Sequence, residues 1–345
     1  MYVLSESEVA NVVGAISINN FMDALIEEIE RGFVEYDQRG VELSRREGYT
    51  SNGNLIEWMP VNDGDQNVTI KVVSYFPTNP TSSQTPTIDA VIIAFDFHSG
   101  KPKAVIGGAL LTAMRTGAAS AVASKRLANQ ESRVLGLVGC GAQAITQAHA
   151  LSRVFPINEV LVYDINKVAL ESIQQRLSFL DVVVRIVDID EIERKSDIIC
   201  TATTNPVGCG PVIQGQSLKP NVHINAVGAD FPGKTELPKE LVKSSFVVTD
   251  FFEQAKIEGE CQVFDSDLAS LEQCVELKEF LSERKDFGAV RDNISIFDST
   301  GVALEDAIAV KVLCDLMKKE GLAKEMDEYP HSLSALDPYA DVMKR

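Results

Sequence analysis

A glycine-rich turn between two apolar runs is the part of this sequence whose residue types most clearly suggest chemistry. The apolar run 134–138 leads into Gly139 and Gly141, a helix-compatible run follows, and a second apolar run ends at Asp164, 25 residues after Gly139. A strand, a glycine turn, a helix, a strand and an acid in this order are typical of a βαβ unit that binds a dinucleotide. The alternative is an ordinary turn that uses glycine for its positive φ.

Each position of this unit has a physical role. Gly139 permits the tight turn, and Gly141 lets the backbone approach a pyrophosphate. A helix that begins at Ala142 would offer unpaired N–H groups to the phosphates. Asp164 would accept hydrogen bonds from both ribose hydroxyls of NAD, and its charge would repel the 2′-phosphate of NADP. We therefore expect NAD as the cofactor.

Composition limits the remaining possibilities. The chain has 345 residues, enough for two domains, and its net charge of −18 disfavours nucleic acid and anionic membranes as partners. It contains no apolar run of membrane-spanning length and no signal-peptide pattern at its N-terminus, so we expect a cytoplasmic protein. The six cysteines form no CxxC pair and the four histidines show no metal-ligand spacing, so we expect reduced thiols and no metal.

The first third of the chain reads as a mixture of helix and antiparallel sheet. Apolar residues recur with helical spacing over residues 19–38, and an exposed loop is expected over 77–86. Thr112 is expected to be the N-cap of a helix that continues to Leu127. This helix is rich in small residues, which permit either close packing or the close approach of a cofactor. Strands are expected at residues 55–59, 68–75, 88–97 and 104–106.

From residue 134 to about residue 299, strands and helices alternate, as in a doubly wound parallel sheet. A final helix is expected over 303–319, followed by an extended tail. We therefore predict an α/β protein in which a Rossmann-type domain, residues 119–302, is inserted in a split α+β domain, residues 1–118 plus 303–345. The substrate should lie between the domains, at the carboxyl ends of the parallel strands. The parallel strands are expected at residues 134–138, 159–164, 182–188, 197–202, 222–227, 246–249 and 294–298.

Several motifs resemble one known family. The segment His-Ile-Asn-Ala-Val-Gly-Ala-Asp-Phe-Pro-Gly-Lys-Thr-Glu-Leu at 223–237 resembles the signature of the ornithine cyclodeaminase/mu-crystallin family, and in particular its bacterial ornithine cyclodeaminases. Supporting motifs occur in the family's order and span residues 45–306. They include Leu-Ile-Glu-Trp-Met-Pro at 55–60, Leu-Thr-Ala-Met-Arg-Thr at 111–116 and Phe-Asp-Ser-Thr-Gly at 297–301.

The resemblance implies a redox-neutral use of NAD. In ornithine cyclodeaminase, NAD+ takes a hydride from Cα of L-ornithine, and the δ-amine attacks the resulting imine. Ammonia then leaves, and the hydride returns to give L-proline. The resemblance also implies a homodimer formed through the sheet of the split domain.

The resemblance also assigns roles to individual residues. Asp230 stands where the family has its catalytic carboxylate, although an Asp before Pro-Gly could simply cap a loop. Lys71 and Arg115 match the carboxylate-binding cations, and Arg46 matches a third, with Arg45 as the adjacent alternative. Glu57 matches the residue that holds the δ-ammonium group. Lys71 and Glu57 both lie on expected strands, where charged side chains are more often at the surface.

Further residues are expected, on the same resemblance, to contact NAD in addition to Gly139, Gly141, Ala142 and Asp164 of the glycine-turn unit. They are Arg115, Gln143, Thr203, Asn225, Ala226, Val227, Gly228, Lys234 and Ser299.

The sequence also departs from the family pattern. Asp89 stands where a Thr touches the cofactor, Phe231 where a Cys follows the catalytic Asp, and Ala229 where a Gly is usual. These changes leave two other functions open. One is an NAD(P)H-dependent ketimine reductase or amino-acid dehydrogenase, which would not need Glu57. The other is a non-catalytic binding protein of the crystallin type.

Overall fold

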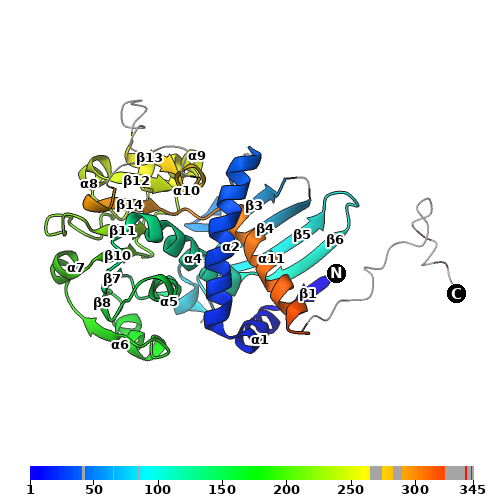
Figure 1. Ribbon diagram of the computed structural model, residues 1–345, viewed down its shortest axis with the longest axis horizontal. Coiled ribbons are helices and arrows are strands. Elements are labelled where there is room, and N and C mark those ends of the chain that lie inside the picture. The colour runs from blue at the N-terminus through cyan, green and yellow to red at the C-terminus, as the bar shows by residue number, and fades with distance from the viewer. Residues whose placement is uncertain are drawn as a thin grey trace.

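Two β-sheets organise the protein, seen in a computed structural model that describes residues 1–40, 43–64, 66–83, 85–264, 274–282 and 290–322, with residues 339 and 343 (Figure 1). The six-stranded sheet and the eight-stranded sheet lie on opposite sides of the helices α2 (Ile18–Arg39) and α4 (Ala109–Leu127). The tail expected after the last helix lies largely outside the described residues.

The six-stranded sheet is built from the first third of the chain, in the order β1-β6-β5-β4-β3-β2. Neighbouring strands from β2 to β6 are antiparallel, as expected, and β1 adds in parallel to β6. One face is buried against α2, α4 and α11 (Ala303–Lys319). The strands are β1 (Tyr2–Leu4), β2 (Glu47–Ser51), β3 (Asn54–Asn62), β4 (Asn67–Tyr75), β5 (Ile88–Asp96) and β6 (Pro102–Gly107), with α1 (Glu6–Ile16) and α3 (Asn79–Ser82) between them.

The eight-stranded sheet is entirely parallel among the described residues, in the order β13-β12-β14-β11-β10-β7-β8-β9. This arrangement confirms the predicted Rossmann-type fold class, whereas the domain boundaries stay a prediction. The strands are β7 (Val134–Val138), β8 (Glu159–Tyr163), β9 (Val183–Ile186), β10 (Ile198–Thr201), β11 (His223–Ala226), β12 (Phe246–Thr249), β13 (Cys274–Glu276) and β14 (Ser295–Asp298). The helices are α5 (Ala142–Val154), α6 (Lys167–Arg176), α7 (Ile189–Lys195), α8 (Lys239–Ser244), α9 (Phe252–Glu258) and α10 (Leu277–Leu281), with short 3-10 turns at Glu260–Val263 and Val290–Asp292.

No single helix among the described residues is long and apolar enough to cross a membrane. Of the helices in the described part of the chain, only α1 and α2 taken together reach the required length and composition, and their axes are bent by 96° at the break between them.

The start of α4 corrects one expectation. Thr112 is not the N-cap, because the helix begins a turn earlier at Ala109. The cap comes from a distant segment: the Glu6 carboxylate accepts hydrogen bonds from the backbone N–H groups of Ala109, at 3.1 Å, and Leu110, at 2.6 Å. This carboxylate satisfies N–H groups that a helix start leaves without partners. Thr112 therefore lies inside the first turn of the helix.

Close packing of α4 on α5 depends on Gly117. A Cβ atom at this position would lie 2.4 Å from the carbonyl oxygen of Thr146 on α5. The small residues of α4 thus bring the helix that carries Arg115 against the helix that follows the glycine turn.

We predict opposite effects for one substitution at two helical glycines. Gly117→Ala should lower the free energy of unfolding by roughly 1–3 kcal/mol, because α5 cannot move away without losing its own contacts. Gly14→Ala, where nothing lies within 4 Å of the added Cβ, should raise it by about 0.5–1 kcal/mol through helix propensity. Urea unfolding of both variants checks this, and equal effects at the two positions would contradict the packing argument.

Candidate functional site

A cavity of about 90 Å³ lies where strands β3 and β4 face α4 and the loops after β11 and β14. The carboxyl ends of the parallel strands therefore contribute to its wall, where ligands of open α/β sheets bind. Many residues singled out from the sequence line this cavity. They are Arg46, Glu57, Lys71, Arg115, Gln143, Val227, Asp230 and Ser299.

Arg46 and Glu57 are partners of each other. The Arg46 Nη1 atom donates to Glu57 Oε1 at 2.7 Å, and its Nε atom lies 2.8 Å from Glu258 Oε1. Its Nη2 atom donates to the carbonyl groups of residues 300 and 301. Burial opposes the charge of Arg46, but Glu57 and Glu258 outweigh burial and raise its pKa. Arg45 is exposed and does not line the cavity, so the structure favours Arg46 of the two candidates.

Lys71 and Arg115 share one buried carboxylate. Asp306 Oδ2 lies 2.8 Å from Lys71 Nζ, and Asp306 Oδ1 accepts a hydrogen bond from Arg115 Nε at 3.0 Å. Glu305 Oε2 accepts a second hydrogen bond from Arg115, at 2.5 Å. Lys71 is only 1% exposed, so it is not a surface lysine. Burial and the nearby Arg115 charge lower its pKa to about 8, against the opposing effect of Asp306.

Three acidic residues of this site were not identified from the sequence: Glu258, Glu305 and Asp306. Glu305 and Asp306 stand in the first turn of α11, where acids usually favour the helix dipole at the surface. Their neighbours Leu304 and Ile308 are buried in the core, so this turn points inward. The sequence feature that could have revealed them is a pair of adjacent acids in an apolar stretch. Buried charges require partners, so such a pair indicates buried cations nearby.

Asp230, the predicted catalytic residue, lies in the loop after β11 and is paired with Lys234. The Lys234 Nζ atom lies 2.8 Å from Asp230 Oδ1 and 5.7 Å from the centre of the Tyr75 ring. Burial opposes the charge of Lys234, but Asp230 outweighs it and raises the pKa of the lysine. Lys234, expected to contact NAD, thus holds the carboxylate of the predicted catalytic residue.

The glycine turn has the features that a dinucleotide requires. Gly139 has a φ of +98°, and a Cβ there would lie 2.5 Å from the carbonyl oxygen of Ala202. Gly141 has open space around it. The Asp164 carboxylate accepts hydrogen bonds from the N–H groups of Cys140, at 2.6 Å, and Asn166, at 2.7 Å, which fixes its orientation beside the turn. These residues fit a bound dinucleotide.

The other expected cofactor residues differ in position. Ser299 lines the cavity, and its buried hydroxyl has no hydrogen-bond partner among the described residues. Thr203 donates its hydroxyl to Glu236, and the Asn225 amide donates to Ser124 Oγ at 3.0 Å inside the protein. The side chain of Asn225 is therefore part of a buried network and not of the cavity wall. The expected residues that do not line the cavity are Gly139, Gly141, Ala142, Asp164, Thr203, Asn225, Ala226, Gly228 and Lys234.

The departures from the family pattern lie outside the cavity lining. Asp89 is exposed, and its carboxylate accepts a hydrogen bond from the neighbouring Ala90 N–H at 2.8 Å. Phe231 is half-buried, and neither it nor Ala229 lines the cavity. We therefore expect these changes to affect the cavity only indirectly.

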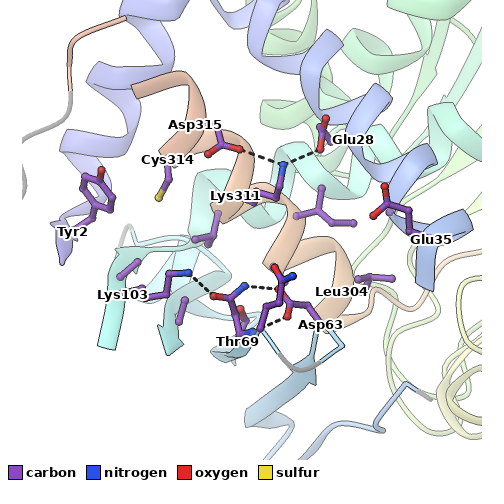
Figure 2. Close-up of a pocket in the computed structure, with 18 of the residues that line it drawn as sticks. Tyr2, Glu28, Glu35, Asp63, Thr69, Lys103, Leu304, Lys311, Cys314 and Asp315 are labelled. Carbon is purple, nitrogen blue, oxygen red and sulfur yellow. Dashed lines mark hydrogen bonds and ion pairs between the residues drawn. The ribbon is translucent and has the colours of Figure 1, made fainter. Parts of the chain in front are cut away.

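A larger cavity, of about 540 Å³, lies between α2, α11 and the six-stranded sheet (Figure 2). Lys311 in this cavity is paired, because it lies 3.2 Å from both Glu28 and Asp315, whereas Lys103 donates to the neutral amide of Asn67 at 2.6 Å. No residue predicted to bind or react lines it. The described residues also contain no group of side chains suited to hold a metal ion.

Comparison with known proteins shows the family to which the chain belongs. The model of the ornithine cyclodeaminase/mu-crystallin family matches residues 6–321. An L-lysine cyclodeaminase from Streptomyces rapamycinicus is 37% identical, over 98% of both chains. An ornithine cyclodeaminase from Agrobacterium fabrum is 32% identical, over 92% of this chain and 91% of the relative.

Solved structures agree with this result. A lysine cyclodeaminase, described for its recognition of L-lysine, L-ornithine and L-2,4-diaminobutyric acid, superposes with a TM-score of 0.92 at 39% identity, over 99% of both chains. An archaeal alanine dehydrogenase dimer with bound NAD superposes with a TM-score of 0.84 at 30% identity, over 95% of this chain and 99% of that chain.

The lowered pKa of Lys71 gives a prediction of known sign. The folded protein releases this proton near pH 8, whereas the unfolded chain keeps it up to the ordinary lysine value of 10.5. Between these values the unfolded chain binds more protons, so the free energy of unfolding rises with pH. Relative to Lys71→Met, the free energy of unfolding of the unaltered protein should rise by roughly 1–3 kcal/mol between pH 8 and pH 10.5, as measured by urea unfolding.

The matched control is Lys103→Met, because Lys103 is exposed and pairs with a neutral amide. The difference in free energy of unfolding between Lys103→Met and the unaltered protein should stay constant over the same pH range. If the corresponding difference for Lys71→Met stays constant or falls with pH, Lys71 is not the buried lysine beside Arg115 that we describe.

Proposed function

The chain belongs to the ornithine cyclodeaminase/mu-crystallin family, and from this premise we propose that it is an NAD-dependent cyclodeaminase that converts L-ornithine to L-proline and ammonia. One observation carries the proposal: the carboxylates of Glu57 and Asp230 share a cavity with the cations Lys71 and Arg115. This arrangement suits a substrate with a carboxylate at one end and a second ammonium group at the other.

The charges in the cavity define the substrate class. Lys71 and Arg115 come from β4 and α4 and provide donors for an α-carboxylate. Glu57 comes from β3, and its carboxylate, which already accepts from Arg46 at 2.7 Å, has further acceptor sites for a terminal ammonium group. A monoamino acid has no group for Glu57, so a diamino acid uses more of the site. L-Lysine, one methylene longer, is the second candidate because the Streptomyces relative is an L-lysine cyclodeaminase.

The glycine turn and Asp164 are the residues that would hold NAD, together with Ser299, which lines the cavity. NAD would supply a hydride acceptor that returns the hydride within the same turnover. Asp230 would accept a proton from the substrate amine and deliver one to departing ammonia. Lys234, 2.8 Å from Asp230, would hold that carboxylate in position for both transfers.

An NAD(P)H-dependent ketimine reductase or amino-acid dehydrogenase is the alternative. The similarity to the archaeal alanine dehydrogenase supports it, because that enzyme shares the fold at 30% identity. Such an enzyme would use Lys71 and Arg115 in the same way but would not need Glu57.

We also propose a homodimer formed through the six-stranded sheet. The face of this sheet turned away from the helices exposes Ile56, Val72 and Val91 by 46%, 39% and 44%. Val72 and Val91 are directly paired across β4 and β5, so the apolar side chains are contiguous. A contiguous exposed apolar patch is typical of a protein–protein interface.

The reaction itself is tested with L-ornithine and an amount of NAD+ far below that of the substrate. We expect ammonia and L-proline in equal amounts without accumulation of NADH. Asp230→Asn should lower kcat by at least about 100-fold, because proton transfer is lost, and should leave NADH binding unchanged. Asp89→Asn is the control for charge removal at an exposed carboxylate and should keep full activity.

If NADH forms in stoichiometric amounts, or if the protein turns over only an imine together with NADH, the protein is a dehydrogenase or a ketimine reductase instead. NADH binding without any turnover would point to the non-catalytic branch of the family.

The proposed interface predicts a change in assembly. Val72→Asp places a charge in the exposed apolar patch and should convert the dimer to a monomer in sedimentation at micromolar concentration. Val183→Asp, at an exposed position of the other sheet, should leave the dimer intact. If the unaltered protein sediments as a monomer, or the Val72→Asp variant stays dimeric, this face is not the dimer interface.

A further inference from the structure

The hydroxyl of Thr112 is buried and is not satisfied by any group in the part of the chain that the structure describes. The residue is 7% exposed, and its Oγ1 atom has no hydrogen-bond partner among the described residues. The residue also lines the cavity that contains Lys71 and Arg115. A buried polar group without a partner is rare and costs stability. A hydroxyl kept in this state at a cavity wall is expected when a ligand supplies the missing partner.

The position of Thr112 on α4 indicates which ligand it meets. Gly117, further along α4, packs against α5, the helix of the glycine turn. At the other end, Gly108 packs against Ala90 and Ile92 of the six-stranded sheet. Thr112 therefore lies at the end of α4 nearer to the sheet that carries Lys71. One turn later, the hydroxyl of Thr116 is already used, because it donates to the Thr112 carbonyl at 2.8 Å.

From this geometry we infer that Thr112 is a further substrate-binding residue, whose hydroxyl donates a hydrogen bond to the α-carboxylate between Lys71 and Arg115. The inference rests on the proposed function, since it assumes an amino-acid substrate. A carboxylate has about four sites that can accept hydrogen bonds, so a third donor can be accommodated beside the two cations. Without substrate, the same hydroxyl lowers the stability of the protein.

The test uses Thr112→Val, which keeps the branched shape and removes the hydroxyl. Its KM for L-ornithine should rise at least about 10-fold, as expected for a lost hydrogen bond to a charged group, while the dissociation constant of NADH stays within about twofold. The melting temperature of the unliganded variant should be higher than that of the unaltered protein. Thr112→Ser should restore most of the affinity.

Ser120→Ala is the matched control. Ser120 lies two turns further along α4 and is fully buried, and its hydroxyl also has no partner within the described ranges, but it does not line the cavity. Its substitution should raise the melting temperature in the same way and leave KM unchanged. A lower melting temperature of Thr112→Val with unchanged KM would show a structural role and overturn the inference, as would a selective loss of NADH affinity.

Failure of the proposed function has a separate signature, which is the absence of proline formation by the unaltered protein. In that case the shift in melting temperature caused by L-ornithine, L-lysine or L-alanine with NADH present still reports on Thr112, because all three carry the α-carboxylate. Loss of this shift in Thr112→Val supports the inference, and an equal shift overturns it. An unaltered protein that shows no such shift overturns both proposals.

Discussion

The shared carboxylate of Asp306 is the interaction on which the site depends. It joins Lys71 on β4 to Arg115 on α4, and it reaches both from α11, which follows them by about 190 residues or more in the chain. Two buried cations in the same cavity wall would repel each other and lose hydration, so neither could stay there without a compensating charge. Because Asp306 orients both, the proposed substrate carboxylate would meet donors that are already in place.

The second constraint is the parallel sheet, which brings distant loops to one edge. The glycine turn follows β7, Asp230 follows β11, and Ser299 follows β14, and β10 and β11 separate the first of these strands from the last. In a parallel sheet the carboxyl ends of these strands lie on the same side. The loops of the eight-stranded sheet and the charged residues of the six-stranded sheet can therefore face one cavity, with α4 between the two sheets.

The sequence alone predicted those features that depend on neighbouring residues or that match the family's motifs. The strand and helix periodicity predicted both sheets, and the turn at Gly139 was recognised from spacing alone. It did not predict interactions between residues that lie far apart in the chain. Glu6 replaces Thr112 as the cap of α4, and Asp306 sits in a helix start that reads as a surface turn. β1 and β13 were missed because each has only three residues, and β2 because all five of its residues are exposed and show no apolar alternation. Motif matching assigned Lys234 to the cofactor, whereas its ion pair with Asp230 required the fold.

We propose that a diamino acid bound in this cavity loses a hydride from its α-carbon to NAD and regains it at the same carbon. L-Ornithine labelled with deuterium at Cα tests this most directly, with product proline analysed by mass spectrometry and NMR. Retention of the deuterium at Cα of proline, without its appearance in accumulated NADH, is the predicted result. Exchange of the label for a solvent proton, or its stoichiometric transfer to the nicotinamide, would contradict the account.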